Sequence, residues 1–295
     1  MSENPFRSVN TRMRMPMLCV ALCLTACAKG ELDLAIADAP VDEAGALVIE
    51  ISGVEIQPVD GDSETVTFSA PLQINLLNYT GGDSVSLLAG QLLDAGDYSW
   101  LRLIVNAETG VRDSYITVNG EEHELTIPKD ALSGLKTSQA FKITRAETSS
   151  FTIDFDLRKS VLEPQTGETE YRLRPALRLV DNADQGTLKG VVSPAVIANE
   201  CGAGDKAAVY LFSADTNQPD DVDGGTPDPI TTATVQLDGV NAYTAAFLED
   251  GSYVVAFTCD AAADQPDTND ADVDFTGKAT VSISAGEITT HDFLP

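Results

Sequence analysis

Short segments in which apolar and polar residues alternate run through most of the chain. The clearest is 151–158. Its apolar residues are Phe151, Ile153, Phe155 and Leu157, and the polar residues between them are Thr152, Asp154, Asp156 and Arg158. A repeat of two residues is that of a β-strand with two different faces. No stretch of helical length keeps apolar residues at i, i+3 and i+4. The pattern therefore predicts an all-β protein.

Segment 171–179 repeats the alternation with basic residues. Tyr171, Leu173, Leu177 and Leu179 fall on one face, opposite Arg172, Arg174 and Arg178. An acidic stripe on one strand and a basic stripe on the next favour a hairpin, because opposite charges stabilise cross-strand pairs. We expect the exposed face of this hairpin to pair carboxylates with guanidiniums.

The composition changes near residue 184. Arginines are common before it and absent after it, where the basic residues are Lys189, Lys206 and Lys278. The length allows one or two domains. We predict two β-sandwich domains, Ig-like or prealbumin-like, at 31–183 and 184–295. The expected strands of the first are 32–37, 47–56, 65–68, 72–77, 98–105, 115–118, 124–127, 140–143, 151–157 and 171–179. The seven expected strands of the second are 187–192, 207–212, 232–237, 243–247, 253–258, 279–283 and 289–294.

Both predicted domains share one local signature. Leu93-Asp94-Ala95-Gly96-Asp97-Tyr98 recurs as Leu248-Glu249-Asp250-Gly251-Ser252-Tyr253, each just before an apolar strand. In β-sandwiches such a tyrosine corner works because the glycine permits a sharp turn and the phenol bonds back to the backbone of the turn. Two copies in matching contexts favour two sandwiches.

The N-terminus is typical of an exported protein. Arg7, Arg12 and Arg14 precede an apolar run over 15–26, which is the layout of a secretory signal and too short for a permanent membrane span. The run ends Leu24-Thr25-Ala26-Cys27, which resembles a bacterial lipobox. We predict a signal peptide over 1–26, lipidation of the Cys27 sulfur by diacylglycerol, with palmitate among the acyl chains, and a short tether over 27–30. The alternative is an ordinary signal peptide with a chance cysteine.

The residues after the lipobox cysteine indicate where the protein is held. Ala28 and Lys29 lack the aspartate that retains the resembled lipoproteins at the inner membrane. We therefore expect a lipid anchor in the outer membrane, on its periplasmic or cell-surface side.

The chain is strongly acidic, with 46 acidic and 18 basic residues and a net charge of −28. This charge argues against nucleic acid and anionic lipid as electrostatic partners. Solubility in a salty medium explains it as well as a binding role does.

Apart from the cysteines at or before Cys27, only Cys201 and Cys259 remain. Because disulfides persist in oxidising compartments, we expect these two to pair.

Several ordered segments of the first half resemble a known family. They are Ile36-Ala37-Asp38-Ala39-Pro40, Ile51-Ser52-Gly53-Val54-Glu55-Ile56, Ala95-Gly96-Asp97-Tyr98 with Arg102-Leu103, Gly134-Leu135-Lys136, Asp154-Phe155-Asp156-Leu157-Arg158-Lys159-Ser160, and Leu173-Arg174-Pro175. Over about 31–180 the chain is similar to bacterial lipoproteins grouped as domain of unknown function 4382, and this resemblance implies no particular activity. The second half is similar to the prealbumin-like sandwiches known as carboxypeptidase regulatory-like modules.

Motifs of common enzyme classes do not occur. The chain has no Gly-x-Ser-x-Gly string, no phosphate loop ending Gly-Lys, and only His123 and His291 as histidines. His123 stands between Glu122 and Glu124, where a charged surface strand explains it better than a general base does. Asp154 and Asp156 form the one pair suited to glycoside cleavage, which uses two carboxyl groups. An ion-paired strand face is the alternative reading of that pair.

Two loops are rich in the oxygen ligands that calcium prefers. The candidate calcium ligands are Asp215, Asn217, Asp220, Asp221 and Asp223 in the first loop, and Asp267, Asn269, Asp270, Asp272 and Asp274 in the second. The spacing does not fit an EF-hand loop, since Phe275 stands where glycine is required. A solvated polar loop is the alternative.

Taken together, these features predict a lipid-anchored, non-enzymatic protein with a structural, adhesive or ligand-binding role. We expect an envelope protein or a glycan as partner. The competing hypothesis is a hydrolase of extracellular polysaccharide that uses Asp154 and Asp156.

Overall fold

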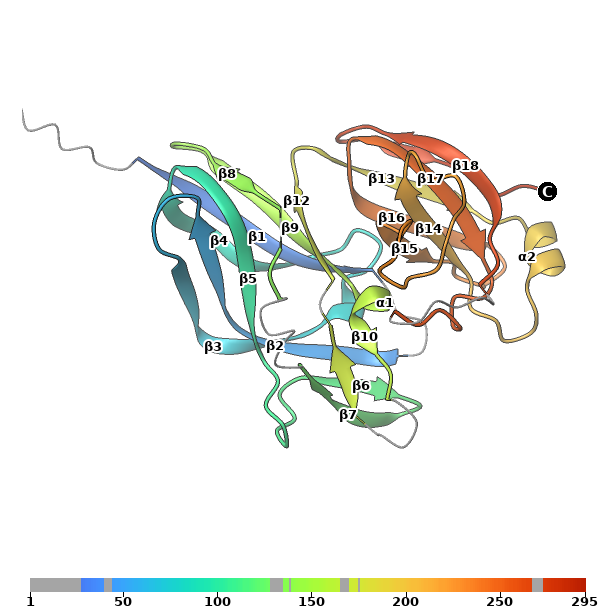
Figure 1. Cartoon of the computed structure of the whole chain (residues 1–295), viewed down its shortest axis with the longest axis horizontal. Helices are drawn as coiled ribbons and strands as arrows, with labels where there is room; N and C mark the ends of the chain where they lie inside the picture. The colour runs from blue at the N-terminus through green and yellow to red at the C-terminus, as the bar shows by residue number, and fades with distance from the viewer. Residues whose placement is uncertain are drawn as a thin grey trace, which may run out of the picture.

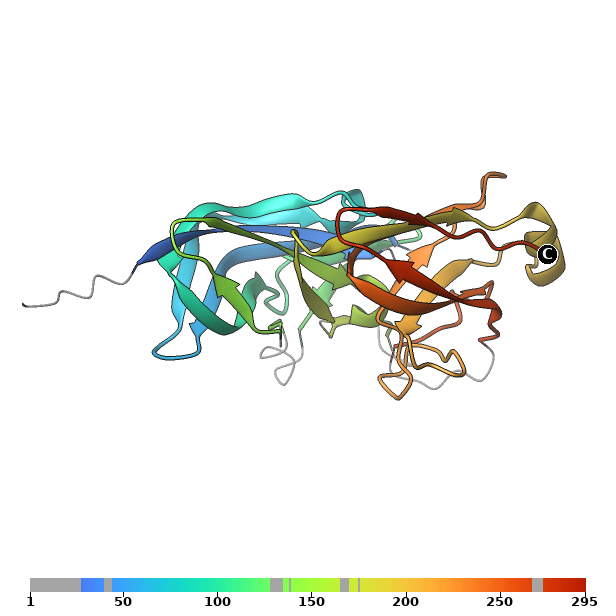
Figure 2. The ribbon, with the colours of Figure 1, turned by 90° about the horizontal axis from the view of Figure 1, so that it is seen from above.

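The computed structural model describes residues 28–39, 44–127, 135–137, 139–164, 170–174, 176–266 and 273–295. Over these residues the chain is almost wholly β-strand, which confirms the predicted fold class. The strands form two sandwiches that lie side by side along the longest axis of the molecule (Figures 1 and 2). Cys27 lies outside the described residues, as do Asp267, Asn269, Asp270 and Asp272.

The first sandwich packs a four-stranded sheet against an eight-stranded one. The four-stranded sheet has the order β12-β9-β1-β4, with β12 at Leu177–Asp181, β9 at Thr148–Asp156, β1 at Lys29–Ala39 and β4 at Val85–Asp94. The larger sheet contains β2 (Ala44–Pro58), β3 (Glu64–Asn75), β5 (Gly96–Asn106), β6 (Tyr115–Val118), β7 (Glu121–Thr126), β8 (Phe141–Ile143), β10 (Val161–Leu162) and β11 (Tyr171–Leu173). Two short helices join strands, η1 at Leu76–Asn78 and α1 at Leu157–Ser160. One apolar core fills the space between the sheets.

The second sandwich contains the seven strands that the sequence predicts. The three-stranded sheet has the order β16-β13-β19, with β16 at Ala242–Glu249, β13 at Gln185–Val191 and β19 at Ile288–Thr290. The four-stranded sheet has the order β15-β14-β17-β18, with β15 at Thr231–Thr234, β14 at Ala208–Ser213, β17 at Gly251–Thr258 and β18 at Thr276–Ile283. Helix α2 (Pro194–Glu200) follows β13 at the far end of the molecule (Figure 1).

Three sequence predictions for the first half were wrong in detail. Strand β4 was missed. Segments 65–68 and 72–77 belong to one strand, β3, which pairs with β2 alone among the described strands and so accommodates Pro71. Segment 171–179 is not one strand, because β11 and β12 belong to different sheets. Between them the Arg174 N–H donates to Ser160 O at 2.7 Å, which directs the chain from one sheet to the other.

The two sandwiches repeat one piece of topology. In the first, β1 pairs with β4 antiparallel and with β9 parallel, and in the second β13 pairs with β16 antiparallel and with β19 parallel. The register also repeats: Gly30 is opposite Leu93 and Gly96 is opposite Ile143, as Gly186 is opposite Leu248 and Gly251 is opposite Ile283. The signature seen twice in the sequence therefore marks equivalent corners of two similar sandwiches.

Both tyrosine corners form as predicted. Tyr98 Oη donates to Asp94 O at 2.7 Å, and Tyr253 Oη donates to Glu249 O at 2.9 Å. The expected role of glycine does not hold at Gly96, which has no positive φ and where an added Cβ would meet no atom within 4 Å. The hydrogen bond of the buried phenol therefore defines the corner, and the glycine is not required there.

Replacing either corner tyrosine with phenylalanine is expected to lower the free energy of unfolding by about 1 kcal/mol, because Asp94 O or Glu249 O loses its partner. Urea denaturation of Tyr98→Phe and Tyr253→Phe measures this loss. Tyr115→Phe is the control, since no hydrogen bond of that hydroxyl is seen, and it should change stability by less than about 0.5 kcal/mol. Equal stability of all three variants would contradict the assigned role of the corners.

Candidate functional site at the junction of the two sandwiches

The segments that carry the family resemblance meet where the first sandwich contacts the second. Strand β1 runs parallel to β9, which places Ala37 opposite Asp154 and Asp38 opposite Phe155. On the other side of β9, Arg178 of β12 is opposite Asp154. Helix α1 follows β9 directly and lies between the two sandwiches (Figure 1). We call this region the junction, and its polar side chains are Asp38, Asp154, Asp156, Arg158, Lys159 and Arg178.

The face of β9 that carries Asp154 and Asp156 was expected to be exposed, and it is buried. Asp154 is 3 % exposed and Asp156 is 2 % exposed. The predicted hairpin does not form, because α1, β10 and β11 separate β9 from β12 in the chain, but one expected pair does: Arg178 Nη2 donates to Asp154 Oδ2 at 2.5 Å. Arg178 also donates to Phe247 O of β16 at 3.4 Å. Although burial lowers the pKa of Arg178, the charge of Asp154 raises it above its ordinary value. The ion pair thus joins two strands inside a domain contact and does not cover an open surface.

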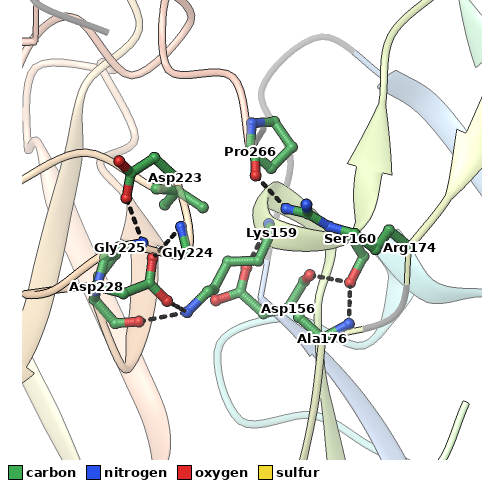
Figure 3. A network of polar contacts seen from close by, with 12 residues as sticks. Asp156, Lys159, Ser160, Arg174, Ala176, Asp223, Gly224, Gly225, Asp228 and Pro266 are labelled. Atoms are coloured by element: carbon green, nitrogen blue, oxygen red, sulfur yellow. Dashed lines mark hydrogen bonds and ion pairs between the residues drawn. The ribbon is translucent and has the colours of Figure 1, made fainter. Parts of the chain in front are cut away.

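Asp156 holds helix α1 in place. Its Oδ1 accepts a hydrogen bond from the Lys159 N–H at 3.2 Å, the usual role of an N-cap aspartate. Its carbonyl accepts from Ser160 Oγ at 2.5 Å, and that hydroxyl accepts from the Ala176 N–H at 2.9 Å (Figure 3). Burial raises the pKa of Asp156 to about 6, although Lys159 opposes the shift. The second carboxylate oxygen, Oδ2, is buried and has no hydrogen-bond partner.

Basic side chains of the first sandwich reach into the second. Arg158 Nη1 donates to Ala261 O at 2.6 Å, and its guanidinium lies 5.7 Å from the ring centre of Tyr210. Lys159 Nζ pairs with Asp228 and donates to Pro229 O at 2.6 Å (Figure 3). Arg174 donates to Pro266 O in the same region (Figure 3). These bonds link residues 69 to 103 positions apart in the chain, so sequence spacing does not reveal them.

Asp38 is the junction residue that sequence reasoning missed. It lies on β1, is 5 % exposed, and neither of its carboxylate oxygens has a hydrogen-bond partner. It lines a small cavity with Asp154, Thr231, Thr232 and Phe247. Burial raises the pKa of Asp38 well above its ordinary value, and the charges of Asp154 and Asp156 raise it further. One sequence feature could have indicated this residue: Asp38 is the aspartate that interrupts the otherwise apolar segment 34–39.

A small cleft of about 50 Å³ opens beside the junction. Ile116, Val118 and Tyr171 line it from the first sandwich, and Ala262 and Pro266 line it from the second. Its polar groups are Arg158, Glu163, Asp264 and Gln265. Apolar walls with a few converging polar groups are typical of small-molecule sites. A wider hollow of about 640 Å³, lined by residues such as Lys142, Glu147 and Ser149, is larger but more polar. We therefore take the cleft as the candidate binding site.

The described parts of the two acidic loops do not form a metal site. Asp264 accepts hydrogen bonds from Tyr210 Oη at 2.5 Å and from the Val222 N–H at 3.0 Å, so it ties one loop to the other. Asp223 accepts from the Gly225 N–H. Among the described residues no three acidic, histidine or cysteine side chains are placed to hold a metal ion. The calcium site stays a prediction. It is tested by measuring the melting midpoint of the protein in calcium and in chelator, and equal midpoints would mean that the loops are only solvated.

The remaining predicted residues have clear positions. Cys201, after α2, forms a disulfide with Cys259, after β17, with the two Cα atoms 5.3 Å apart, which confirms the predicted pairing. His123 lies on β7 opposite Ile116, and its ring centre is 5.1 Å from that of Tyr171. In the described part of the chain, no helix is both long and apolar enough to cross a membrane.

The chain was compared with curated proteins and with solved structures. No curated protein matches the chain. Among solved structures, the Bacillus anthracis TIE protein aligns with 90% of this chain at 13% identity and a TM-score of 0.21, and the chain spans about a third (34%) of its length. GBS52, the minor pilin of Streptococcus agalactiae, aligns with 88% of the chain and 93% of its own length at 10% identity and a TM-score of 0.22. The major pilin subunit BcpA of Bacillus cereus aligns with 90% of the chain and 98% of its own length at 12% identity and a TM-score of 0.21.

The family comparison bears on the first sandwich. The family model that matches is described as a domain of unknown function, DUF4382, and the match covers most of the first sandwich, including β1, β9 and helix α1. The motifs that meet at the junction lie within the matched residues, except for Ala176 and strand β12. Residues 29–175 of this chain therefore match the domain of unknown function DUF4382, as the sequence motifs predicted.

Proposed function

We propose that the protein is a non-catalytic element of the cell envelope, held to the outer membrane by lipid on Cys27, that presents two docked sandwiches to an envelope protein or a glycan. The observation that carries this proposal is the burial of Asp154 and Asp156. Asp154 is ion-paired with Arg178 and Asp156 caps α1, so both carboxylates hold the junction together. Inside that contact a polysaccharide chain cannot reach them, and this argues against the hydrolase hypothesis.

The cleft supports a binding role. Glycans are bound through an apolar or aromatic surface together with a few polar groups, and Tyr171, Arg158 and Gln265 supply both kinds of contact here. Because the cleft has walls from both sandwiches, its shape depends on the junction. We therefore propose the cleft as the place where a sugar or a small segment of an envelope partner binds.

A glycan array combined with a reducing-sugar assay tests this function. We expect the purified protein to bind a subset of glycans without releasing reducing ends. Tyr171→Ala should abolish that binding, whereas Tyr115→Ala, on β6 of the same sheet and outside the cleft, should retain it. Release of reducing ends by the wild type, abolished in Asp154→Asn, would instead establish the hydrolase.

The anchor is tested separately. Replacing Cys27 with serine removes the sulfur that would carry the lipid, so we expect the protein to move from the membrane fraction to the soluble fraction. Cys23→Ser is the matched control, because it lies in the predicted signal peptide, and should leave the protein in the membrane fraction. Continued membrane association of Cys27→Ser would contradict the lipid anchor and leave the binding role untouched.

A further inference from the structure

Among the described residues of the junction, Asp38 and Asp156 are buried carboxylates that make no ion pair, although Lys159 and Arg158 act on Asp156 at longer range. Arg158 faces Asp264 and the carbonyl of Ala261, and Lys159 pairs with Asp228, so both are directed toward groups of the second sandwich. Arg178 is then the cation that contacts the carboxylates of the first sandwich directly, and it contacts Asp154. Asp38 and Asp156 each keep buried oxygens with no hydrogen-bond partner. A buried, ionised and unpaired carboxylate is very unfavourable, so another species must balance this charge.

Asp38 is enclosed by elements of both sandwiches. Within the first, Asp154 and Asp156 of β9 face it and raise its pKa, whereas the Leu157 N–H of α1 is directed toward it, outside regular hydrogen-bond geometry, and opposes that rise. Within the second, the cavity walls come from Thr231 and Thr232 of β15 and from segment 244–247 of β16, which holds no titratable side chain. The charged groups of the remaining neighbours act on Asp154 and Asp156: Arg178 on β12, Lys159 and Arg158 on α1, and Tyr253 of β17 next to Arg178.

Either a metal ion or a proton can neutralise such a carboxylate. The cavity has room for about one water molecule and offers Asp38 and Asp154 as its carboxylates. Asp154 is already bound to Arg178, and the described residues include no three acidic, histidine or cysteine side chains arranged for a metal. Calcium needs six to eight oxygen ligands, which this cavity does not supply. A proton binds to one oxygen of the carboxylate and needs no further ligands.

We propose that the junction is a proton-dependent latch, in which Asp38 carries a proton while the two sandwiches are docked and releases it when they separate. When the docked Asp38 loses its proton, a negative charge remains in the cavity beside Asp154 and Asp156. Separating the sandwiches exposes that charge to water, and the ionised state therefore favours separation. The apolar contacts of Ala37, Val180 and Phe247 oppose it and keep the sandwiches docked while Asp38 is neutral.

The direction of the pH effect follows from linkage. The pKa values of Asp38 and Asp156 are raised in the docked protein, Asp38 by burial and then by Asp154, and Asp156 by burial to about 6. A raised carboxyl pKa favours the docked state most below the ordinary pKa of aspartate, and that contribution is lost as the pH rises through the raised value. Docking is therefore tight at pH 5 and weaker at pH 8.

Small-angle X-ray scattering of the purified full chain at pH 5 and pH 8 tests the latch. Both values lie above the isoelectric point near 4.1, so the protein keeps a net negative charge. We expect the maximum dimension of the wild type to increase at pH 8 and that of Asp38→Asn to stay at its pH 5 value. Asp97→Asn is the control: this exposed aspartate of β5 makes the same change in net charge, and the variant should expand as the wild type does.

Carbon-13 NMR of aspartate side chains in the wild type provides a test that does not depend on folding of the variant. The resonance assigned to Asp38 should report a neutral carboxyl at pH 5 and titrate at a higher pH than exposed aspartates. An ionised Asp38 at pH 5, equal dimensions of the wild type at both pH values, or equal expansion of Asp38→Asn and wild type would each overturn the latch. Expansion that follows chelator rather than pH would assign the site to a cation and also overturn it.

Discussion

Replacing Arg178 with alanine is expected to destabilise the folded protein by about 3–5 kcal/mol, the loss typical when one partner of a buried ion pair is removed. Asp154 would then remain 3 % exposed with no cation in contact, next to Asp38 and Asp156. Chemical denaturation followed by circular dichroism measures the change.

Two further variants distinguish the stability lost with the buried ion pair from the stability lost with an exposed one. Arg112→Ala removes a pair with Glu122 in which both side chains are about half exposed, so its effect should stay below about 1 kcal/mol. The double variant Asp154→Leu and Arg178→Leu removes both charges and should recover much of the stability lost in Arg178→Ala. A loss in Arg178→Ala no larger than that in Arg112→Ala would show that the junction pair does not hold the sandwiches together.

Removing the disulfide is expected to lower the stability of the second sandwich by about 4 kcal/mol, because the bond closes a loop and restricts the unfolded chain. Cys201 and Cys259 are 58 positions apart and connect the end of α2 to the end of β17. The variant Cys201→Ala with Cys259→Ala should therefore unfold at a lower denaturant concentration than the oxidised wild type.

Reductant provides the matched control for the disulfide. Adding it to the wild type should lower the unfolding midpoint toward that of the double variant, and adding it to the variant should change nothing. Equal midpoints of oxidised wild type and double variant would mean that strain in the folded state offsets the restriction of the unfolded chain. That result would contradict a stabilising role for this disulfide.

Sequence reasoning was most successful in the second sandwich. Its seven strands were all predicted because each is short, rich in β-branched, aromatic or other apolar residues, and separated from the next by polar, glycine- or proline-containing turns. The Gly-x-Tyr signature also predicted the corner hydrogen bonds of Tyr98 and Tyr253, since that interaction spans only four residues. The disulfide followed from the small number of cysteines. These features depend on local sequence or on elimination.

The same reasoning failed where distant segments meet. Strand β4 has consecutive apolar residues rather than alternation, and Gly90 within it has a φ of +63°, so its pattern resembles no simple strand. The alternation over 171–179 continues through Arg174, although the chain there leaves one sheet for the other. That change is caused by a hydrogen bond to Ser160, fourteen positions earlier in the chain.

The sequence by itself determined the β-class of the protein, the strands of the second sandwich, the corner tyrosines, the disulfide and the single pair of Asp154 with Arg178. Only the tertiary structure decided what covers the polar face of β9. A repeat of two residues separates the two faces of a strand, but it does not say whether a polar face meets water or another domain. Asp154, Asp156 and Arg158 therefore look like surface residues in the sequence. They are buried because the second sandwich packs against them, through contacts between residues 69 to 103 positions apart.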